Sequence, residues 1–281
     1  MPGLFALTFG FSAAAAQDTP PPTRPDAASI QWAPASGNSC ERYRGHRVCN
    51  GPRRVPLLEG AAEARAIAFG LVGGSVARHA TTGPVPDAWV QAAVREGAQA
   101  APNLLWPVPE GRLWRGFGRR QGFARRRGRL IRTRRQHMHN GVDIGAAEGA
   151  AIVAVNDGLV VYSDNGMHGY GNAVLIAHPD GSVSMYAHCI ETYVVPGKLV
   201  RRGEVIAAVG QTGITHGAHL HFEYRSGGEL HDPLTLFVNI PERRTPRGVS
   251  PSASGTVEAD WDAVDVPPAA TPTETAHDVE P

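Results

Sequence analysis

The sequence predicts a mainly β protein, built on an antiparallel sheet with a short helical segment in front of it. Apolar runs at 151–156 and 159–163 flank Asp157-Gly158, and this dipeptide between apolar runs is typical of a hairpin turn. The same pattern returns at 172–188 around Pro179-Asp180-Gly181. No alternation of strands with helices, as in a parallel βαβ fold, is visible here. With 42% hydrophobic residues in 281, the chain can bury a substantial core.

A strictly alternating stretch carries polar groups on one face of another expected strand. In GAHLHFEYR, residues 217–225, His219, His221 and Glu223 alternate with apolar side chains. Successive side chains of a strand point to opposite faces. We therefore expect both imidazoles on one face of the strand, where they could contact the same bound group.

Residues 57–104 predict a helical segment in front of the sheet domain, which we expect over 105–240. Apolar residues recur at helical spacing from 57 to 73, the pattern of an amphipathic helix. A second helix is expected from Pro86-Asp87 to Gly97. These helices could pack on the sheet domain or on each other, so the role of this segment stays open.

The two ends of the chain predict export and little regular structure. Residues 1–16 join an apolar run to small residues, as a secretory signal does, although no Lys or Arg precedes the run and a plain apolar terminus is the alternative. Residues 17–56 predict a Pro-rich linker and residues 241–281 a disordered tail. No run reaches the about 18 apolar residues of a membrane span. We therefore expect no transmembrane span, and a location in the periplasm or on the extracellular side of the cell envelope.

The three cysteines have different expected roles. Cys40 and Cys49 lie close together in the linker and could close a small ring by a disulfide after export, the alternative being two free thiols. Cys189 follows His188 on an expected strand and should point to the opposite face. We interpret it as a small buried hydrophobic residue rather than a ligand.

Residues 112–135 hold eleven arginines, which raises the question of a nucleic-acid partner. Clustered arginine neutralises phosphates, and interleaved aromatic residues could stack on bases. No nucleic-acid fold signature accompanies the run, however, so we expect no nucleic-acid partner. A solvated basic loop, or attachment to an anionic envelope, is the simpler interpretation.

Metal donors gather in HMHNGVDIG, residues 137–145. Together with His221, His139 and Asp143 supply two imidazoles and one carboxylate, which are donors that suit Zn²⁺. Three protein ligands and an open position describe a catalytic zinc site, whereas closed structural sites often use thiolates. The HExxH motif of helical zinc proteases is absent from the sequence.

Three motifs in order, HNGVDIG, YAH and HLHFEYR, resemble the signatures of the lysostaphin-type zinc metallo-endopeptidases, which cut the peptide part of bacterial peptidoglycan. The resemblance extends over about residues 104–237 and implies the β-sheet architecture of that family. It implies further that one Zn²⁺ is bound by His139, Asp143 and His221, and that His188 and His219 act beside the metal. Cys189 stands where the family usually has Leu, and Ala218 where it usually has Pro; neither change removes a donor.

The implied reaction is hydrolysis of an amide bond by a zinc-activated water, assisted by the two further histidines. The alternative is a non-enzymatic envelope-binding or regulatory module on the same fold, because that family includes members that have lost ligands. A biotin or lipoyl carrier, suggested by VRRGEVIAAVG, is set aside because no lysine stands at an exposed hairpin tip.

Four other residues have open interpretations. His137 should share a face with His139 and could be an alternative ligand or a substrate contact, but a surface histidine is the preferred interpretation. His168 and His216 could lie beside the site. Tyr186 is two residues before His188, so it should face the same side; it could donate a hydrogen bond there, or be an ordinary half-exposed tyrosine of the strand.

Overall fold

The computed structural model describes residues 23–34, 40–43, 46–73, 75–126 and 129–241, and for 40–49 and 120–137 it describes the backbone alone. The expected signal peptide, residues 1–16, and nearly all of the expected tail lie outside these ranges. None of the helices within them is long and apolar enough to cross a membrane.

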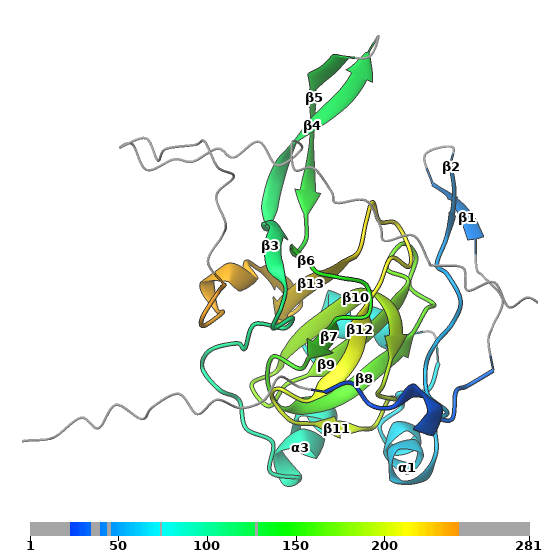
Figure 1. Cartoon of the computed structure of the whole chain (residues 1–281). Coiled ribbons are helices and arrows are strands. Elements are labelled where there is room, and N and C mark those ends of the chain that lie inside the picture. The colour runs from blue at the N-terminus through cyan, green and yellow to red at the C-terminus, as the bar shows by residue number, and fades with distance from the viewer. Residues whose placement is uncertain (1–22, 35–39, 44–45, 74, 127–128, 242–281) are drawn as a thin grey trace, which may run out of the picture.

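Ten of the described strands form one sheet, in which every pairing is antiparallel. The main order is β11-β8-β9-β10-β13-β6-β3; β12 pairs with β10 and β7, and β14 pairs with β13 (Figure 1). The mainly β, antiparallel fold class is therefore confirmed. The strand bounds are β3 Arg112–Arg115, β6 Val142–Gly145, β7 Ala151–Val153, β8 Gly158–Asp164, β9 Asn172–Ala177, β10 Ser182–Thr192, β11 Leu199–Val200, β12 Val205–Val209, β13 His219–Ser226 and β14 Glu229–His231.

One of the two predicted hairpins is confirmed, and the other is wrong. The turn at Pro179-Asp180-Gly181 joins β9 to β10, which pair with each other. Asp157-Gly158 instead joins β7 to β8, and these strands pair with other neighbours. The reason is tertiary: the Asp157 carboxylate accepts hydrogen bonds from the backbone N–H groups of Gln99 and Arg202. The turn is thereby fixed to distant segments.

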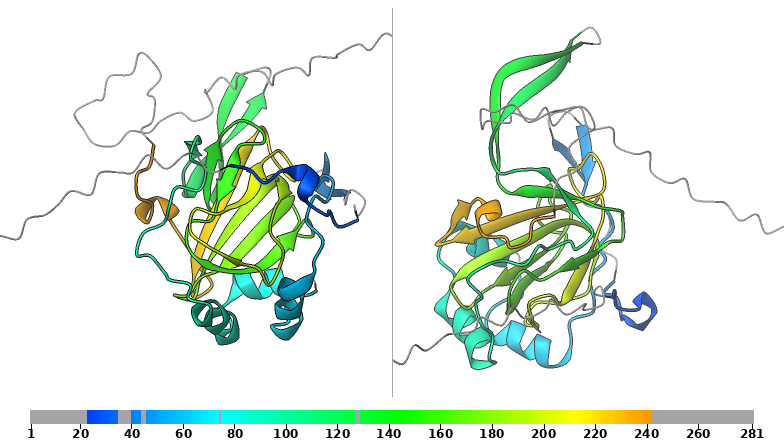
Figure 2. Two further views of the ribbon diagram at one scale, coloured as in Figure 1. Left: turned by 60° about the horizontal axis from the view of Figure 1, so that its bottom comes forward. Right: turned by 60° about the vertical axis from the view of Figure 1, so that its left-hand side comes forward.

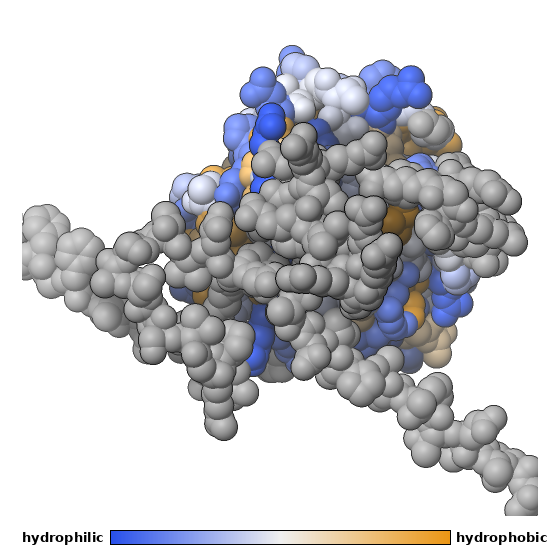
Figure 3. Space-filling model, turned by 90° about the horizontal axis from the view of Figure 1, so that it is seen from above, coloured by the Kyte–Doolittle hydropathy of each residue, from blue (hydrophilic) through white to orange (hydrophobic). Residues whose placement is uncertain are grey.

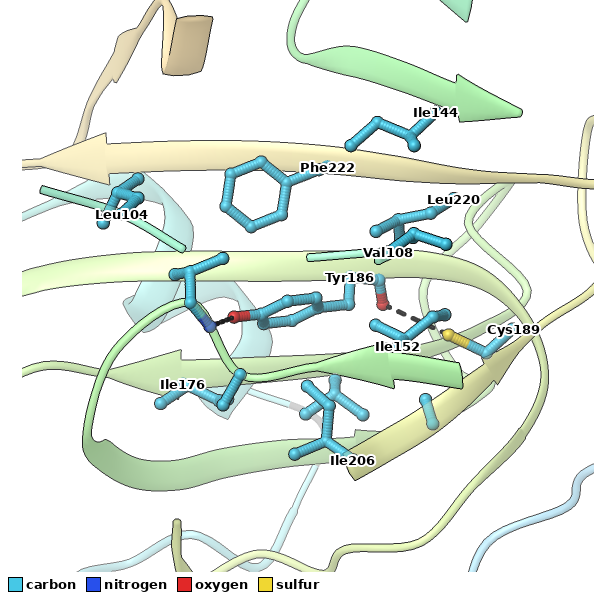
Figure 4. Close-up of a cluster of buried hydrophobic side chains, with 14 of the residues drawn as sticks. Leu104, Val108, Ile144, Ile152, Ile176, Tyr186, Cys189, Ile206, Leu220 and Phe222 are labelled. Carbon is cyan, nitrogen blue, oxygen red and sulfur yellow. Dashed lines mark hydrogen bonds between the residues drawn. The ribbon is translucent and has the colours of Figure 1, made fainter. Parts of the chain in front are cut away.

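The core lies on both faces of the sheet. On one face, Tyr186 and Phe222 pack with a set of buried aliphatic residues (Figure 4). The Tyr186 hydroxyl accepts a hydrogen bond from the Val155 N–H at 2.9 Å, which satisfies a polar group in this apolar surrounding. On the other face, strand residues such as Leu175 and Met185 pack against helix residues such as Trp89.

Three helices cover part of this second face: α1 Gly60–Ala68, α2 Val76–Thr82 and α3 Asp87–Arg95 (Figure 1). Two of them occupy the predicted helical stretches, although α1 is shorter than the predicted 57–73, and α2 was not predicted. Contacts of α2 and α3 with β8 show that the helices pack on the sheet, which answers the question left open by the sequence.

Gly197 shows how closely α1 sits on the sheet domain. Its φ is +85°, and a Cβ built there would lie 2.1 Å from the Ala62 carbonyl oxygen; Arg65 Nε also donates to the Gly197 carbonyl at 2.7 Å. Gly181 has a similar φ of +80° but open space around it.

We expect Gly197→Ala to lower the free energy of unfolding by about 1–3 kcal/mol more than Gly181→Ala, because only the first adds a clash to the cost of the left-handed backbone. Chemical denaturation checks this, with hydrogen exchange over 60–68 as the local readout; equal losses in the two variants would contradict it.

The described part of the expected linker contacts the sheet domain closely. The side chain of Arg53 pairs with Asp164 at 2.7 Å, and the Thr192 N–H donates to the Arg54 carbonyl. Asn172 donates to the Pro52 carbonyl at 3.1 Å. Residues 52–54 thus lie against the ends of β8, β9 and β10. The two ends of the sheet domain lie together, because the N–H of Leu104 donates to the Leu236 carbonyl at 2.8 Å. Both residues are near the predicted boundaries of the domain, 105 and 240, and these boundaries stay predictions.

Two hairpins stand outside the main sheet (Figures 1 and 2). In the first, β1 Cys40–Tyr43 pairs with β2 His46–Cys49, and the register sets Cys40 opposite Cys49. This placement is compatible with the expected disulfide, which stays a prediction. In the second, β4 Gly118–Arg126 pairs with β5 Arg129–His139. The arginine-rich stretch is therefore mostly a β-hairpin rather than the expected loop, and the views agree that it projects from the body of the domain. Hydrophilic residues dominate the coloured part of the surface seen in Figure 3, and hydrophobic residues form separate areas.

His178 is a fully buried histidine away from the predicted site. Its Nδ1 lies 2.7 Å from the Asp157 carbonyl oxygen and its Nε2 lies 2.8 Å from Ser184 Oγ. Burial lowers the pKa of His178, against the opposing effects of the Asp157 carbonyl and the charges of Asp180 and Asp157. The folded protein therefore keeps this ring neutral at pH values where the unfolded chain binds a proton.

A stability change with pH follows from this burial. Because the folded pKa is depressed, the contribution of His178 is fully present above the unfolded pKa of about 6.5 and is lost as the pH falls below it. We expect the free energy of unfolding of His178→Gln to fall less steeply than that of the unaltered protein between pH 7 and 5, by up to about 1.4 kcal/mol per pH unit. Urea denaturation at several pH values measures the slopes. A slope for His178→Gln that is parallel to that of the unaltered protein would refute the expectation.

Candidate metal centre

Two neighbouring strands bring His221 and Asp143 together. The pairing of β13 with β6 sets His221 directly opposite Asp143, and side chains opposite each other in such a pair lie on the same face. His139 ends β5, four residues before Asp143, and its Cα pairs with that of Gly118 at the base of the projecting hairpin. The sheet register therefore joins residues that are 78 positions apart.

The donor atoms of these three residues converge. His221 Nδ1 lies 2.9 Å and His139 Nε2 lies 3.1 Å from Asp143 Oδ1, and the three donors all lie within 4.8 Å of one another. Asp143 is also 3.9 Å from Arg115 Nη1. His139, Asp143 and His221 are thus positioned to bind a metal ion.

In His139 and His221, one ring nitrogen has a hydrogen-bond acceptor beside it, and the other ring nitrogen faces Asp143 and can serve as a metal donor. His139 Nδ1 donates to the Gly116 carbonyl at 2.7 Å, so in the neutral ring Nε2 keeps its lone pair. His221 Nε2 lies 3.1 Å from Glu223 Oε1, which favours a proton on that nitrogen and a lone pair on Nδ1. Two lone pairs and a carboxylate oxygen that face one another call for a cation between them, and this donor set fits Zn²⁺.

The charges of this group are strongly coupled. Burial alone would raise the pKa of Asp143, but hydrogen bonds with His139 and His221 hold it well below its usual range. Burial alone would lower the pKa of His221, but its hydrogen bonds to Asp143 and Glu223 raise it to about 9. Without a metal, a proton on His221 therefore balances the neighbouring carboxylates.

His188 reaches the site through an irregularity in β10. The pairings of β10 shift between Tyr186 and Cys189, and His188 has a φ of 63°. A bulge of this kind changes which face the following side chains occupy. The His188 ring accordingly lies near His219 and His221, with ring centroids 4.8 and 5.8 Å apart.

His188 and His219 share a hydrogen-bonding pattern. Nδ1 of His188 donates to the Thr212 carbonyl and Nδ1 of His219 donates to the Gly217 carbonyl, each at 2.8 Å. Since a carbonyl can only accept, Nε2 of each neutral ring is left as an acceptor. Burial lowers the pKa of both rings, with the neighbouring histidines adding to the effect, and that of His188 falls to about 3. His219 Nε2 lies 3.6 Å from Asp143 Oδ1, so an uncharged base borders the metal donors.

The expectation for Tyr186 is wrong, because the bulge breaks the simple alternation on which it rested. Tyr186 is fully buried in the core, where it packs against Phe222 with ring centroids 5.3 Å apart. Cys189 lies in the same core cluster, so the interpretation of Cys189 as a buried small residue is confirmed (Figure 4).

The structure leaves the other open histidines without an assigned role. His168 and His216 are exposed, and the backbone of His137 pairs with that of Arg120 in the projecting hairpin. Neither His168 nor His216 belongs to the group of donors found among the described residues. The prediction for His137 concerns a side chain outside the described part of the structure.

Four residues beside the site were not predicted as part of it: Tyr170, Glu223, Arg225 and Trp114. Tyr170 donates to Glu223 Oε1 at 2.9 Å, Arg225 Nη2 donates to Glu223 Oε2 at 2.8 Å, and Trp114 packs edge-on against His219 with centroids 5.5 Å apart. Glu223 shares a strand face with His221, so its involvement could have been found from the alternation. Tyr170 and Trp114 come from distant segments and give no signal in the sequence.

Residues 137–233 match the family model described as peptidase family M23. The chain contains a domain of this lysostaphin-type peptidase family. The M23 domain thus includes all five residues of the expected site and most of the main sheet. Its strand pairings, described above, agree with the fold class that the resemblance implied.

The M23 domain is similar to several named proteins. The murein hydrolase activator NlpD of Salmonella dublin is 36% identical over 145 residues, which cover 51% of this chain and 33% of that protein. The DD-carboxypeptidase/endopeptidase Mpg of Neisseria meningitidis is 39% identical over 105 residues, 37% of this chain and 24% of that protein. Among solved structures, the antimicrobial peptidase lysostaphin from Staphylococcus simulans is 22% identical, with a TM-score of 0.40 over 56% of this chain and 61% of that one. The matched region spans a third or less of the length of the two relatives.

Proposed function

We propose that this protein is a zinc-dependent endopeptidase that hydrolyses amide bonds in the peptide part of bacterial peptidoglycan, and that it acts in the cell envelope after export. The observation that carries the proposal is the juxtaposition of two groups. The metal donors His139, Asp143 and His221 converge at one point, and two neutral histidines lie directly beside them. A binding module has no need of uncharged imidazoles next to a metal.

Each residue has a chemical role in this proposal. Zinc held by the three donors would lower the pKa of a bound water and polarise the scissile carbonyl. Nε2 of His188 or of His219 accepts the proton of the attacking water and returns it to the leaving amine. Before it passes the proton on, the ring that holds it stabilises the negative charge that develops on the carbonyl oxygen. The carbonyls of Thr212 and Gly217 hold the two rings in orientation.

A second function is favoured by the similarity to proteins named murein hydrolase activators. In that case the domain binds the cell wall, or another protein there, and cuts nothing itself. A complete donor set and neutral histidines support the enzyme, whereas the names of these relatives support the activator.

Mass spectrometry of fragments released from purified peptidoglycan tests the choice. Zinc-loaded protein should release peptides with new amino termini, and their masses identify the bond that is cut. Treated in the same way, His221→Ala protein should release none, and His188→Ala protein should release them at least about 100-fold more slowly. If all three proteins sediment with the cell wall and release nothing, the endopeptidase proposal fails and the binding function takes its place.

A further inference from the structure

Glu223 lies behind His221, on the side away from Asp143. Its Oε1 is 3.1 Å from His221 Nε2, while His221 Nδ1 is 2.9 Å from Asp143. The His221 ring is therefore held between two carboxylates, one at each nitrogen. The side chain of Glu223 has no exposed surface, so its carboxylate is surrounded by protein atoms rather than by solvent.

The position of Glu223 in the sheet does not by itself require a charge. Glu223 is paired with Met185 across β10 and β13, and Met185 belongs to the apolar cluster under the helices. Burial of a carboxylate is costly unless hydrogen bonds and an opposite charge compensate it. Glu223 has these partners: Tyr170 donates to Oε1 at 2.9 Å and Arg225 to Oε2 at 2.8 Å. This compensation indicates a specific use for the carboxylate.

We propose that Glu223 is a positioning residue for the metal centre, which accepts the Nε2 proton of His221 and so leaves the Nδ1 lone pair directed at Asp143 and His139. A carboxylate behind a histidine ligand fixes the orientation of the ring and makes the other nitrogen a better donor. The inference rests on the metal of the proposed function, but not on the reaction.

The same network joins the metal centre to the helical segment. Arg225 Nη1 donates at 2.9 Å to the carbonyl of Thr81, which lies in the last turn of α2. Carbonyls at the end of a helix lack partners within the helix and accept hydrogen bonds from cations. Thr81, Arg225, Glu223 and His221 therefore form consecutive contacts from α2 to a metal donor. In this proposal, the end of α2 supports the metal centre through the Thr81 carbonyl.

Zinc affinity of the full chain, measured by competition with a chromophoric chelator and without peptidoglycan, tests the inference. We expect Glu223→Ala to bind zinc about 100-fold more weakly than the unaltered protein, and Glu223→Gln about 10-fold more weakly, because the amide oxygen can still accept the Nε2 proton. Glu191→Ala is the matched control: Glu191 is also buried, but its side chain pairs with Arg24 at 3.0 Å and accepts from Tyr193 at 2.8 Å, and neither partner is a metal donor. This variant should lose stability and keep its zinc affinity.

The outcomes separate the inference from the proposed function. The positioning role would be overturned if folded Glu223→Gln and Glu223→Ala both bind zinc within about twofold of the affinity of the unaltered protein. If the alanine variant does not fold, the zinc affinity of Glu223→Gln alone decides. An equal loss of affinity in Glu191→Ala would also overturn it, since any buried carboxylate would then have the same effect. If the unaltered protein binds zinc but releases no peptidoglycan fragments, the reaction proposal fails while the role of Glu223 stands.

Discussion

Replacing His221 by alanine is expected to abolish both zinc binding and hydrolysis. His221 supplies one of the three converging donors, and its ring lies between Asp143 and Glu223. Loss of a direct donor should weaken zinc binding by more than the about 10- to 100-fold that loss of a supporting residue costs. The expected result is a protein that retains no zinc after dialysis and releases no peptidoglycan fragments.

Metal analysis after dialysis and the fragment assay measure these two effects on the same preparation. The control is His231→Ala, because His231 is an exposed histidine on the neighbouring strand β14. It should bind zinc and act as the unaltered protein does. Stoichiometric zinc in His221→Ala after dialysis would show that the metal binds at a site other than this one.

Replacing His188 or His219 by alanine is expected to separate metal binding from catalysis. Their Nδ1 atoms donate to backbone carbonyls and their rings lie beside the donors without belonging to them. Each variant should therefore retain zinc but lose about 10²- to 10⁴-fold in kcat, the range for removal of a general acid or base. Steady-state rates on a soluble peptidoglycan fragment, normalised to bound zinc, give the comparison.

The double variant refines this expectation. If one ring takes the proton and the other accepts a hydrogen bond from the same attacking water, both act in one transition state and their losses should not simply add. A variant that loses zinc together with activity would instead make His188 or His219 a ligand. Full activity in both single variants would remove these histidines from the mechanism.

Local patterns in the sequence were sufficient for much of the β-sheet domain. Alternation over 217–225 correctly placed His219, His221 and Glu223 on one strand face, because side-chain direction in a strand depends on the backbone alone. The turn at Pro179-Asp180-Gly181 was also predictable, since it joins strands that are neighbours both in sequence and in space. The motifs around His139 and His221 were enough to indicate the family.

Long-range contacts decided what the local patterns could not. The register of β6 against β13 brings Asp143 to His221. A bulge in β10 after Tyr186 turns His188 toward them, whereas Tyr186, before the bulge, faces the core. Both depend on pairing with other strands, which the order of residues along β10 does not specify. Asp157-Gly158 failed as a hairpin for the same reason.

The sequence by itself determined the strand-rich fold class, the identity of the candidate donors and the face that carries them, because each is set by residue type and spacing within a few positions. Only the tertiary structure decided that α2 packs on the sheet and that Tyr170, Arg225 and Thr81 are linked through Glu223 to His221. The contacts of Tyr170 with Glu223 and of Arg225 with Thr81 join residues 53 and 144 positions apart. Their hydrogen bonds are strengthened by the low dielectric of the protein interior, and that interior exists only once the chain has folded.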